Sequence, residues 1–331
     1  MHHRMLRRVR ISRAIYVLAI GQAIIACSDS TTTTGPPPLL VDTRLIAFVS
    51  DSGNSSGSSI FVMHADGTHK TRVTGDNHRD DSPAWSPNGS TIAFTSDRSP
   101  QGIWVVDADG NNLRPLVTAP DFLDPGEPAW SPDGHSIAFS SALRDSLGNF
   151  IGVIMFADAD GSHARQLTTT ATDVGAPAWS PDGTRILFVN SPDGISPHVF
   201  VIRTDGTSQQ QLTNSLDFQP RWSPNGRLIA FTNLEPLDNT ILAHITVMQP
   251  DGANRRVLAR GGVNRRPAWS PDAQQIAYDG YTRDSTSGAF LTYTRIFRMN
   301  ANGSDLRPMT SDGGQFHPAF RSWAPVWKPT P

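Results

Sequence analysis

The sequence predicts an all-β protein, a six-bladed β-propeller of four-stranded antiparallel blades. Three observations support this prediction: a Trp-containing motif that occurs five times, an Asp-Gly or Asn-Gly motif that occurs six times, and intervals of 43 to 49 residues between successive motif tryptophans. Repeats of about 40–50 residues with four strand-length segments are typical of propeller blades. After the first 26 residues, the sequence has no window with the 3.6-residue apolar period of an amphipathic helix.

The first motif joins two strand candidates through a turn. Its copies are PAWSPNGSTIAF (83–94), PAWSPDGHSIAF (128–139), PAWSPDGTRILF (177–188), PRWSPNGRLIAF (220–231) and PAWSPDAQQIAY (267–278). Ser-Pro-Asn/Asp-Gly favours a type I turn, because Pro presets the backbone and Gly accepts the positive φ that follows. Each motif Trp is expected to bury its ring against the neighbouring blade. These structural tryptophans are Trp85, Trp130, Trp179, Trp222 and Trp269.

The second motif supplies the third and fourth strands of each blade. Its copies are IFVMHADGTHKTRVT (60–74), IWVVDADGNNLRPLVT (103–118), VIMFADADGSHARQLT (153–168), VFVIRTDGTSQQQLT (199–213), ITVMQPDGANRRVLA (245–259) and IFRMNANGSDLRPMT (296–310). Asp-Gly between alternating apolar runs predicts a hairpin turn. The same dipeptide resembles part of a calcium loop, but the Gly and Glu positions of an EF-hand are not met.

The unequal motif counts predict how the ring closes. RLIAFVS (44–50) begins the folded region without a Trp motif before it, so the missing partner strand is expected near the C-terminus. Two candidates remain open, HPAF (317–320) and PVWKP (325–329). Turn spacing favours Phe320, whereas residue identity favours Trp327 as the sixth structural Trp. Either choice predicts that the last strand pairs with the first.

On these repeats the chain resembles the TolB-like β-propeller family. The resemblance rests on P-A-W-S-P-D-G-x-x-I-A-F followed by D-G-x-x-x-R-x-L-T, and it covers residues 44–331. It implies the propeller fold and a similarity to binding scaffolds of the cell envelope. The repeat is specific for the fold and not for function. TolB itself carries a small domain before its propeller, which this chain replaces by a short tether, so TolB partner contacts are not transferred.

The N-terminus predicts export and lipid attachment. Residues 1–26 consist of a basic segment followed by an apolar segment, as in a secretory signal. The apolar segment is shorter than a membrane-spanning helix, which needs about 20 residues. The segment ends in Ile-Ile-Ala-Cys, similar to a bacterial lipobox, and Cys27 is the only cysteine. An ordinary signal with a chance Cys is the alternative. Residues 27–43 are predicted to be a Thr/Pro-rich tether, and residues 44–331 the propeller.

These features predict a protein of the bacterial cell envelope, exported and lipid-anchored, in the periplasm or at the outer membrane. Charged residues make up 18% of the chain and the formal net charge is -2. This composition argues against nucleic-acid binding. We expect a monomer that contacts membrane only through its lipid.

The candidate binding site lies at the mouth of the central channel. In a four-stranded meander, the repeating turns share one rim, and the irregular loops share the other, where binding residues usually occur. The residue before each motif proline is expected near the channel. The candidate binding residues are His78, Asp80, Asp81, Glu127, Asp173, Asp217, Arg266 and His317. A plain solvated loop is the alternative. No cofactor is predicted, although a channel cation stays open and no metal ligands are assigned.

The predicted function is a non-enzymatic scaffold that binds an envelope protein, a peptide or a glycan at the irregular-loop rim. No catalytic residue is predicted. GNSSG (53–57) matches the serine-hydrolase elbow in letters, but a strand rather than a helix is expected after it. The alternative is a metal-assisted polysaccharide lyase or hydrolase on the same propeller, with His317, His78 and Glu127 as its candidate residues.

Overall fold

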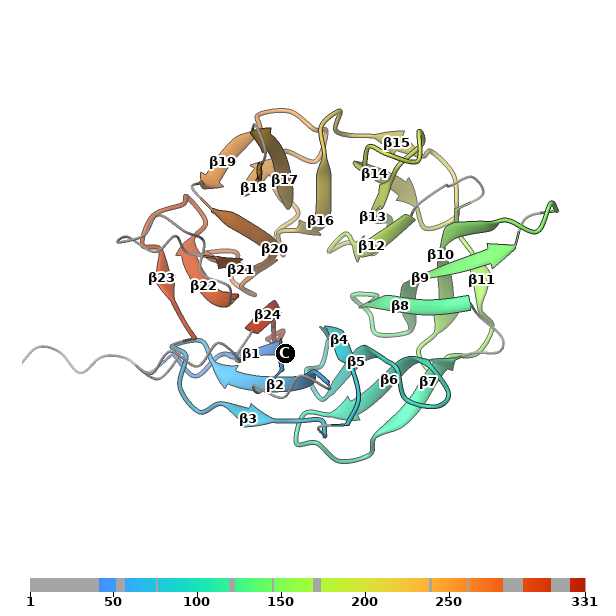
Figure 1. The fold of residues 1–331 in the computed structure, drawn as a ribbon, viewed down its shortest axis with the longest axis horizontal. Helices are drawn as coiled ribbons and strands as arrows, with labels where there is room; N and C mark the ends of the chain where they lie inside the picture. The colour runs from blue at the N-terminus through green and yellow to red at the C-terminus, as the bar shows by residue number, and fades with distance from the viewer. Residues whose placement is uncertain are drawn as a thin grey trace, which may run out of the picture. The chain divides into compact units, whose positions relative to one another are not determined.

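The described part of the chain forms one compact unit built from β-strands. The computed structural model describes residues 42–51, 57–75, 77–118, 123–144, 146–168, 174–237, 240–260, 262–281, 294–310 and 322–330. The compact unit spans Val41–Pro331. Its sheets surround a central axis, with one strand of each group nearest that axis (Figure 1). The predicted all-β propeller is therefore confirmed.

Four sheets are separate four-stranded blades. The first consists of β24 (Ser322–Trp327), β1 (Leu45–Ser50), β2 (Ser59–His64) and β3 (Thr71–Arg72). The second consists of β4 (Asp80–Trp85), β5 (Thr91–Ser96), β6 (Gly102–Asp107) and β7 (Arg114–Thr118). The third consists of β8 (Leu123–Trp130), β9 (Ser136–Arg144), β10 (Phe150–Asp158) and β11 (Arg165–Gln166). The fourth consists of β12 (Val174–Trp179), β13 (Arg185–Asn190), β14 (His198–Arg203) and β15 (Gln210–Gln211).

The remaining strands form one eight-stranded sheet, and the predicted ring of six blades is therefore wrong. Its members are β16 (Asp217–Trp222), β17 (Ile229–Leu237), β18 (Thr240–Met248), β19 (Arg256–Ala259), β20 (Val263–Trp269), β21 (Gln275–Tyr281), β22 (Arg295–Asn300) and β23 (Arg307–Pro308). A parallel pair, Ala243 with Val263, joins β18 to β20. The structure has four separate blades and this double sheet.

The joint lies in the extended part of β17 and β18, which are longer than the corresponding strands of most repeats. Each has nine residues, whereas β5 and β6 have six. The extension brings Ala243 level with the start of β20, where its N–H donates to the carbonyl of Gly262 at 3.1 Å. The repeat motifs do not contain this segment, so their spacing could not reveal the pairing.

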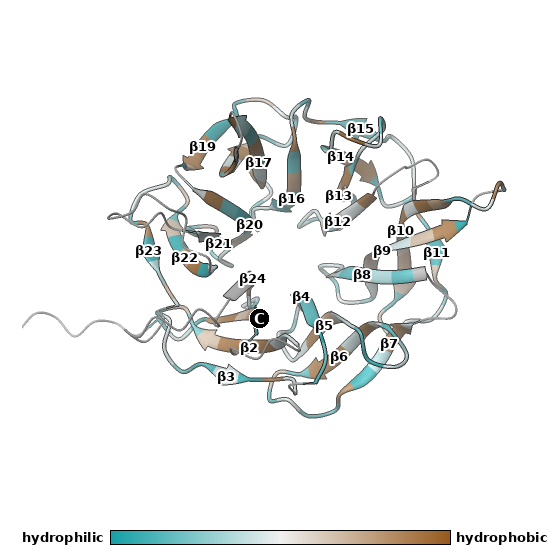
Figure 2. Ribbon diagram, in the orientation of Figure 1, coloured by the Kyte–Doolittle hydropathy of each residue, from teal (hydrophilic) through white to brown (hydrophobic). Residues whose placement is uncertain are grey.

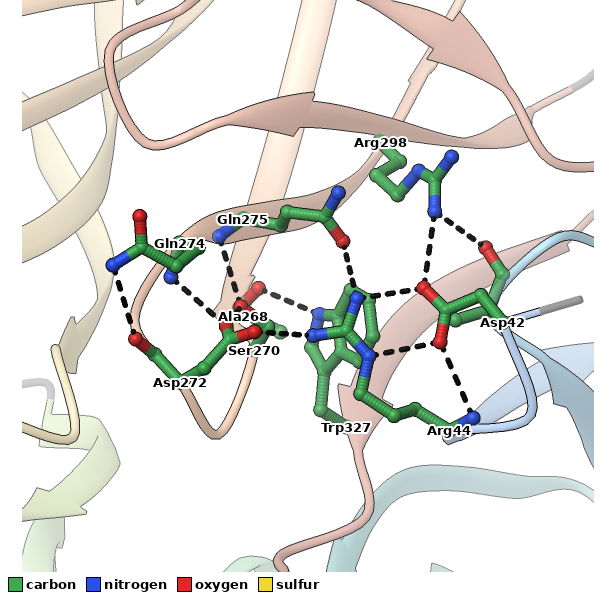
Figure 3. A network of polar contacts seen from close by, with 10 residues as sticks. Asp42, Arg44, Ala268, Ser270, Asp272, Gln274, Gln275, Arg298 and Trp327 are labelled. Atoms are coloured by element: carbon green, nitrogen blue, oxygen red, sulfur yellow. Dashed lines mark hydrogen bonds and ion pairs between the residues drawn. The ribbon is translucent and has the colours of Figure 1, made fainter. Parts of the chain in front are cut away.

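Strands β24 and β1 bring the two ends of the described chain together. Ile46 pairs with Trp327, and Ser50 pairs with Ser322. The indole Nε1 of Trp327 donates to the carbonyl of Ala268 on β20 at 3.1 Å (Figure 3). Segment 325–329 therefore supplies the last Trp-type strand. Segment 317–320 lies outside the described residues.

The core lies between neighbouring sheets and is built mainly from the second and third strand of each group. In β5 the residues Ile92, Ala93 and Phe94 are fully buried, and the same three positions are buried in the other repeats. Apolar residues colour these middle strands in Figure 2, while outer strands such as β3 are hydrophilic. The arrangement leaves the innermost strands free to line a central cavity.

Candidate binding site

A central cavity of about 260 Å³ lies between the innermost strands. It is lined by β4, β8, β12, β16, β20 and β24, each of which contributes residues around its motif proline. The polar side chains in the lining are Ser82, Glu127, Gln219, Arg221 and Arg266. Pro132 also lines the cavity, so the space extends toward the rim of the Ser-Pro-Asp-Gly turns.

Each innermost strand is distorted at the residue before its motif proline. These residues adopt the left-handed conformation, with φ between 49° and 53°; they are Ser82, Glu127, Ala176, Gln219, Arg266 and Ala324. The sheet register shifts at the same point, for example between Asp81 and Ala84. Such a bulge bends the strand and re-aims its side chains. Positive φ is costly for residues other than Gly, so the neighbouring structure must hold it in place.

Side chains from the preceding repeat stabilise several of these bulges. The N–H of Glu127 donates to Thr95 Oγ1 at 3.1 Å, and the N–H of Arg266 donates to Thr232 Oγ1 at 3.1 Å. Thr95 and Thr232 are equivalent, since both directly follow an Ile-Ala-Phe triplet. Glu127 performs the same task for the next repeat: its Oε2 accepts the N–H of Ala176 at 2.6 Å.

A buried carboxylate supports the bulge of β24. Asp279 is fully buried, occupies the position equivalent to Thr95, and accepts the N–H of Ala324 at 3.3 Å. Its Oδ2 lies 3.2 Å from NH1 of Arg266 and 3.8 Å from Nε of Arg265. Burial raises the pKa of the Asp279 carboxyl, against the opposing effect of the two guanidinium groups. The positive charge of Arg266 thus has a carboxylate partner.

Arg221 differs from Arg266 in its surroundings. It occupies the place that Ala84, Ala129, Ala178, Ala268 and Val326 occupy in the other innermost strands. Its NH1 donates to the carbonyl of its own neighbour Pro220 at 2.9 Å. Within the described residues, no carboxylate lies within ion-pair distance of it. Burial lowers the pKa of the Arg221 guanidinium, and the charge of Glu127 opposes this shift.

The structure places the predicted site residues in different surroundings. Glu127 and Arg266 line the cavity, and the charge of Asp81 acts on Arg266. His78 is partly exposed, with its Nδ1 3.5 Å from Oδ1 of Asp97. Cys27, Asp173 and His317 lie outside the described residues. A binding role for any of them stays a prediction.

Asp80 and Asp217 are buried carboxylates that form ion pairs away from the cavity lining; the partner of Asp80 is buried, and that of Asp217 is partly exposed. Asp80 is fully buried and pairs with Arg98, whose NH2 lies 3.0 Å from Oδ2. Asp217 is fully buried and lies 3.1 Å from NH1 of Arg255. These carboxylates hold the starts of β4 and β16 against neighbouring strands.

Arg221 is the cavity residue that the sequence analysis did not single out. The only sequence feature that marks it is the change from Pro-Ala-Trp to Pro-Arg-Trp in a motif whose other residues form the strand and the turn. Across the described residues, no group of three or more His, Cys, Asp or Glu side chains is placed to hold a metal ion. A channel cation stays open, as the sequence left it. Nor does this part of the chain contain a helix long and apolar enough to span a membrane.

A second surface feature lies on the rim of the irregular loops. Five large apolar side chains are exposed at connections between the second and third strands of three successive repeats. They are Leu147, Phe150, Ile195, Leu237 and Ile241. Figure 2 shows the apolar colour at the projecting end of hairpin β9–β10. We call these five residues the apolar rim.

The repeated strand order, the central cavity and the paired terminal strands define the class of this protein as a β-propeller built from Pro-Ala-Trp-Ser-Pro-Asp-Gly repeats. The family model described as TolB beta propeller domain matches residues 10–173 and 124–327. The chain belongs to this family, and the predicted resemblance is confirmed.

Curated relatives share shorter stretches with the chain. The Tol-Pal system protein TolB of Zymomonas mobilis is 37% identical over 75 residues, which is 22% of this chain and 16% of that protein. The Tol-Pal system protein TolB of Gluconobacter oxydans is 29% identical over 106 residues, 32% of this chain and 22% of that protein. The matched stretches thus span about a fifth of the length of these relatives.

Solved structures share the fold. TolB from Acinetobacter baumannii has a TM-score of 0.71 at 20% identity, covering 87% of this chain and 68% of that chain. An oligogalacturonate lyase from Vibrio parahaemolyticus has a TM-score of 0.57 at 11% identity, covering 82% and 76%. At these identities the likeness is one of fold alone.

Proposed function

We propose that this protein is a non-enzymatic binding scaffold of the bacterial cell envelope that holds a protein partner on its apolar rim. Membership of the TolB beta propeller domain family supports this proposal, as does similarity to proteins named for the Tol-Pal system. The lipobox-like sequence at Cys27 supports export and attachment to a membrane by lipid. The rigid sheets would present the rim without rearrangement.

The observation that carries the proposal is the exposure of the apolar rim. Leu147 is 84% exposed, Ile195 82%, Phe150 60%, Ile241 58% and Leu237 50%. Grouped apolar side chains in contact with water cost free energy, and a partner surface that covers them recovers it. Because three successive repeats contribute at the same end of their strands, one partner could cover all five.

The hairpins that carry these residues also favour a protein partner. Strands β9 and β10 extend well beyond the two residue pairs that β11 makes with β10. Phe150 therefore lies on a stretch of β10 whose outer edge is not paired with β11. A strand edge that no other described strand pairs with, beside apolar side chains, suits an extended segment of another chain.

The decisive experiment compares serine substitutions on the apolar rim with serine substitutions on the opposite rim, both in the full-length protein in its own cell envelope. The rim variant carries Leu147→Ser, Phe150→Ser, Leu237→Ser and Ile241→Ser. The control carries Leu113→Ser and Leu306→Ser, which are 42% and 49% exposed at the opposite rim. After chemical cross-linking, we expect one specific adduct that the rim variant loses and the control keeps. Retention in the rim variant, or equal loss in both, would contradict the proposal.

Lipid attachment has its own test. Metabolic labelling with a fatty-acid analogue is expected to mark the wild-type protein, and Cys27→Ser is expected to abolish the label and release the protein from the membrane fraction. A Cys27→Ser protein that stays in the membrane fraction would overturn the proposed anchor.

The enzymatic alternative is supported by likeness of fold alone. Metal analysis of the purified protein, followed by assays on oligogalacturonate and envelope glycans, separates it from the scaffold. The lyase or hydrolase would be favoured if the protein contains bound metal and turns over one of these substrates. In that case His78→Ala or Glu127→Gln should abolish the turnover.

A further inference from the structure

We propose that the central cavity binds a carboxylate group through the guanidinium of Arg221. This site is separate from the apolar rim: the cavity extends toward the repeating turns, and the rim lies at the other end of the strands. The ligand class is a monoanionic carboxylate on a small molecule or at the end of a peptide.

The position of Arg221 shows that the fold does not require a guanidinium there. Four equivalent positions in the other innermost strands are Ala and one is Val, and all these strands keep the same bulge. Small apolar side chains therefore satisfy the architecture. A long cation at this one position puts charge into a cavity that the other repeats line with methyl groups.

The hydrogen-bonding capacity of Arg221 is largely unused by the protein. A guanidinium has five N–H donors arranged as a planar fork. One group, NH1, donates to Pro220 O at 2.9 Å, and within the described residues Arg221 has no ion-pair partner. Arg266 provides the contrast, since Asp279 takes its charge. A carboxylate matches the fork of Arg221 in two parallel hydrogen bonds and neutralises a partly desolvated charge.

The electrostatics of the cavity favour a carboxylate over phosphate. Glu127 also lines the cavity, and its charge reaches both Arg221 and Arg266. A ligand with two negative charges would be repelled by Glu127, whereas a single negative charge matches Arg221, the one cation among the described lining residues that has no ion-pair partner. The cavity of about 260 Å³ has room for several groups the size of water, at about 30 Å³ each in the liquid.

The test is a titration of the full-length protein with propionate and with inorganic phosphate at constant ionic strength, followed through the NMR signals of the arginine side chains. We expect a saturable shift of Arg221 with propionate, and phosphate binding at least about tenfold weaker. Arg221→Ala should abolish the saturable binding. Arg221→Lys should weaken it, because an ammonium group keeps the charge and loses the fork.

The control is Arg227→Ala, which removes the same charge from an exposed turn outside the cavity lining. It should bind propionate as the wild-type protein does. Melting curves of Arg221→Ala should match the wild type, since Ala occupies the equivalent positions. Any of three results would overturn the proposal. The wild-type protein shows no saturable shift, Arg221→Ala binds propionate as tightly as the wild type, or phosphate binds as tightly as propionate. Serine substitutions on the apolar rim should leave the titration unchanged, so the two proposals fail independently.

Discussion

The guanidinium of Arg44 lies over the indole ring of Trp327, with 4.9 Å from Cζ to the ring centroid. The same guanidinium reaches Asp272 through NH1 at 2.7 Å and Gln275 through NH2 at 2.8 Å, both at the turn between β20 and β21 (Figure 3). Trp327 in turn donates to Ala268. The first strand, the last strand and the double sheet therefore meet in one network.

Replacement of Trp327 by Phe tests this seam. Both Trp327 and Trp85 are buried, 4% and 5% exposed, but only Trp327 has a hydrogen-bond partner for Nε1 among the described residues. Trp327→Phe leaves the Ala268 carbonyl without its donor, at a cost of about 1–3 kcal/mol beyond the lost packing. Trp85→Phe loses packing and weakens the contact with Lys328 Nζ, 5.5 Å from the ring centroid, but it breaks no side-chain hydrogen bond within the described residues. Denaturant unfolding should show the larger loss for Trp327→Phe, and equal losses would contradict this account.

Glycine turns pack one repeat against the next. Gly161 has φ +88°, and a Cβ built there would lie 2.2 Å from the carbonyl oxygen of Leu116 in the preceding blade. Gly206 has φ +84°, but its Cβ would lie 3.5 Å from Leu167 O, an ordinary contact. Gly206→Ala should cost about 1–2 kcal/mol from backbone conformation. Gly161→Ala should cost about 1–3 kcal/mol more from overpacking.

Thermal melts of the two glycine variants give the comparison directly. Because the φ values nearly match, the difference between the variants isolates the contact with Leu116. Equal melting temperatures would mean that the blades can move apart without cost.

The buried ion pair of Arg98 and Asp80 should be essential for stability. Arg98→Ala leaves the fully buried Asp80 without its cation, which should cost about 3–5 kcal/mol. Arg307→Ala removes an exposed pair with Asp305, which should change stability by less than about 1 kcal/mol. The double variant Arg98→Ala with Asp80→Ala should lose less free energy of unfolding than the sum of the two single variants. A loss equal to that sum would contradict the pairing.

Acid should weaken the repeating turns. The hydroxyl of Ser131 donates a hydrogen bond to Asp133, and this bond lowers the pKa of the Asp133 carboxyl below its usual 3.8; the N–H of His135 adds a smaller effect. Hydrogen bonds from Ser180 and Thr184 lower the pKa of Asp182 in the same way. A lowered native pKa means that the unfolded chain binds more protons, so this stability is present above about pH 4 and is lost as pH falls through the lowered values.

The chain itself supplies the control for this pH dependence. Asn88 and Asn225 occupy the same turn position as Asp133 and Asp182 and accept the same kind of Ser hydrogen bond. Asp133→Asn with Asp182→Asn should therefore fold at neutral pH and lose less stability between pH 4 and pH 2. An unchanged acid transition by circular dichroism would show that these carboxylates do not contribute.

The repeats predicted the propeller because each repeat carries its own strands and turns. The number of blades was wrong because the pair Ala243–Val263 is formed by residues outside both motifs. Motif counting also left two C-terminal candidates open, and Trp327 was distinguished only by its backbone pairing with Ile46.

The candidate site was less accessible to sequence reasoning. Glu127 and Arg266 precede a motif proline, which predicts a place near the channel, and both residues do line the cavity. The charge of Asp80 and Asp217 and their nearness to the motif prolines predict a site, but the sequence does not reveal that Arg98 and Arg255 lie beside them. Arg221 gives no strong signal in the sequence, because one Arg in a repeated motif is typical of ordinary variation between repeats.

The shared backbone pair between β18 and β20 has a consequence for local opening. A separate blade can exchange its amide hydrogens when it alone opens, but the double sheet couples its two halves through Ala243 and Val263. Amides within its strands, from Asp217 to Arg307, should thus exchange as one cooperative unit, and this third of the ring should be the last to open.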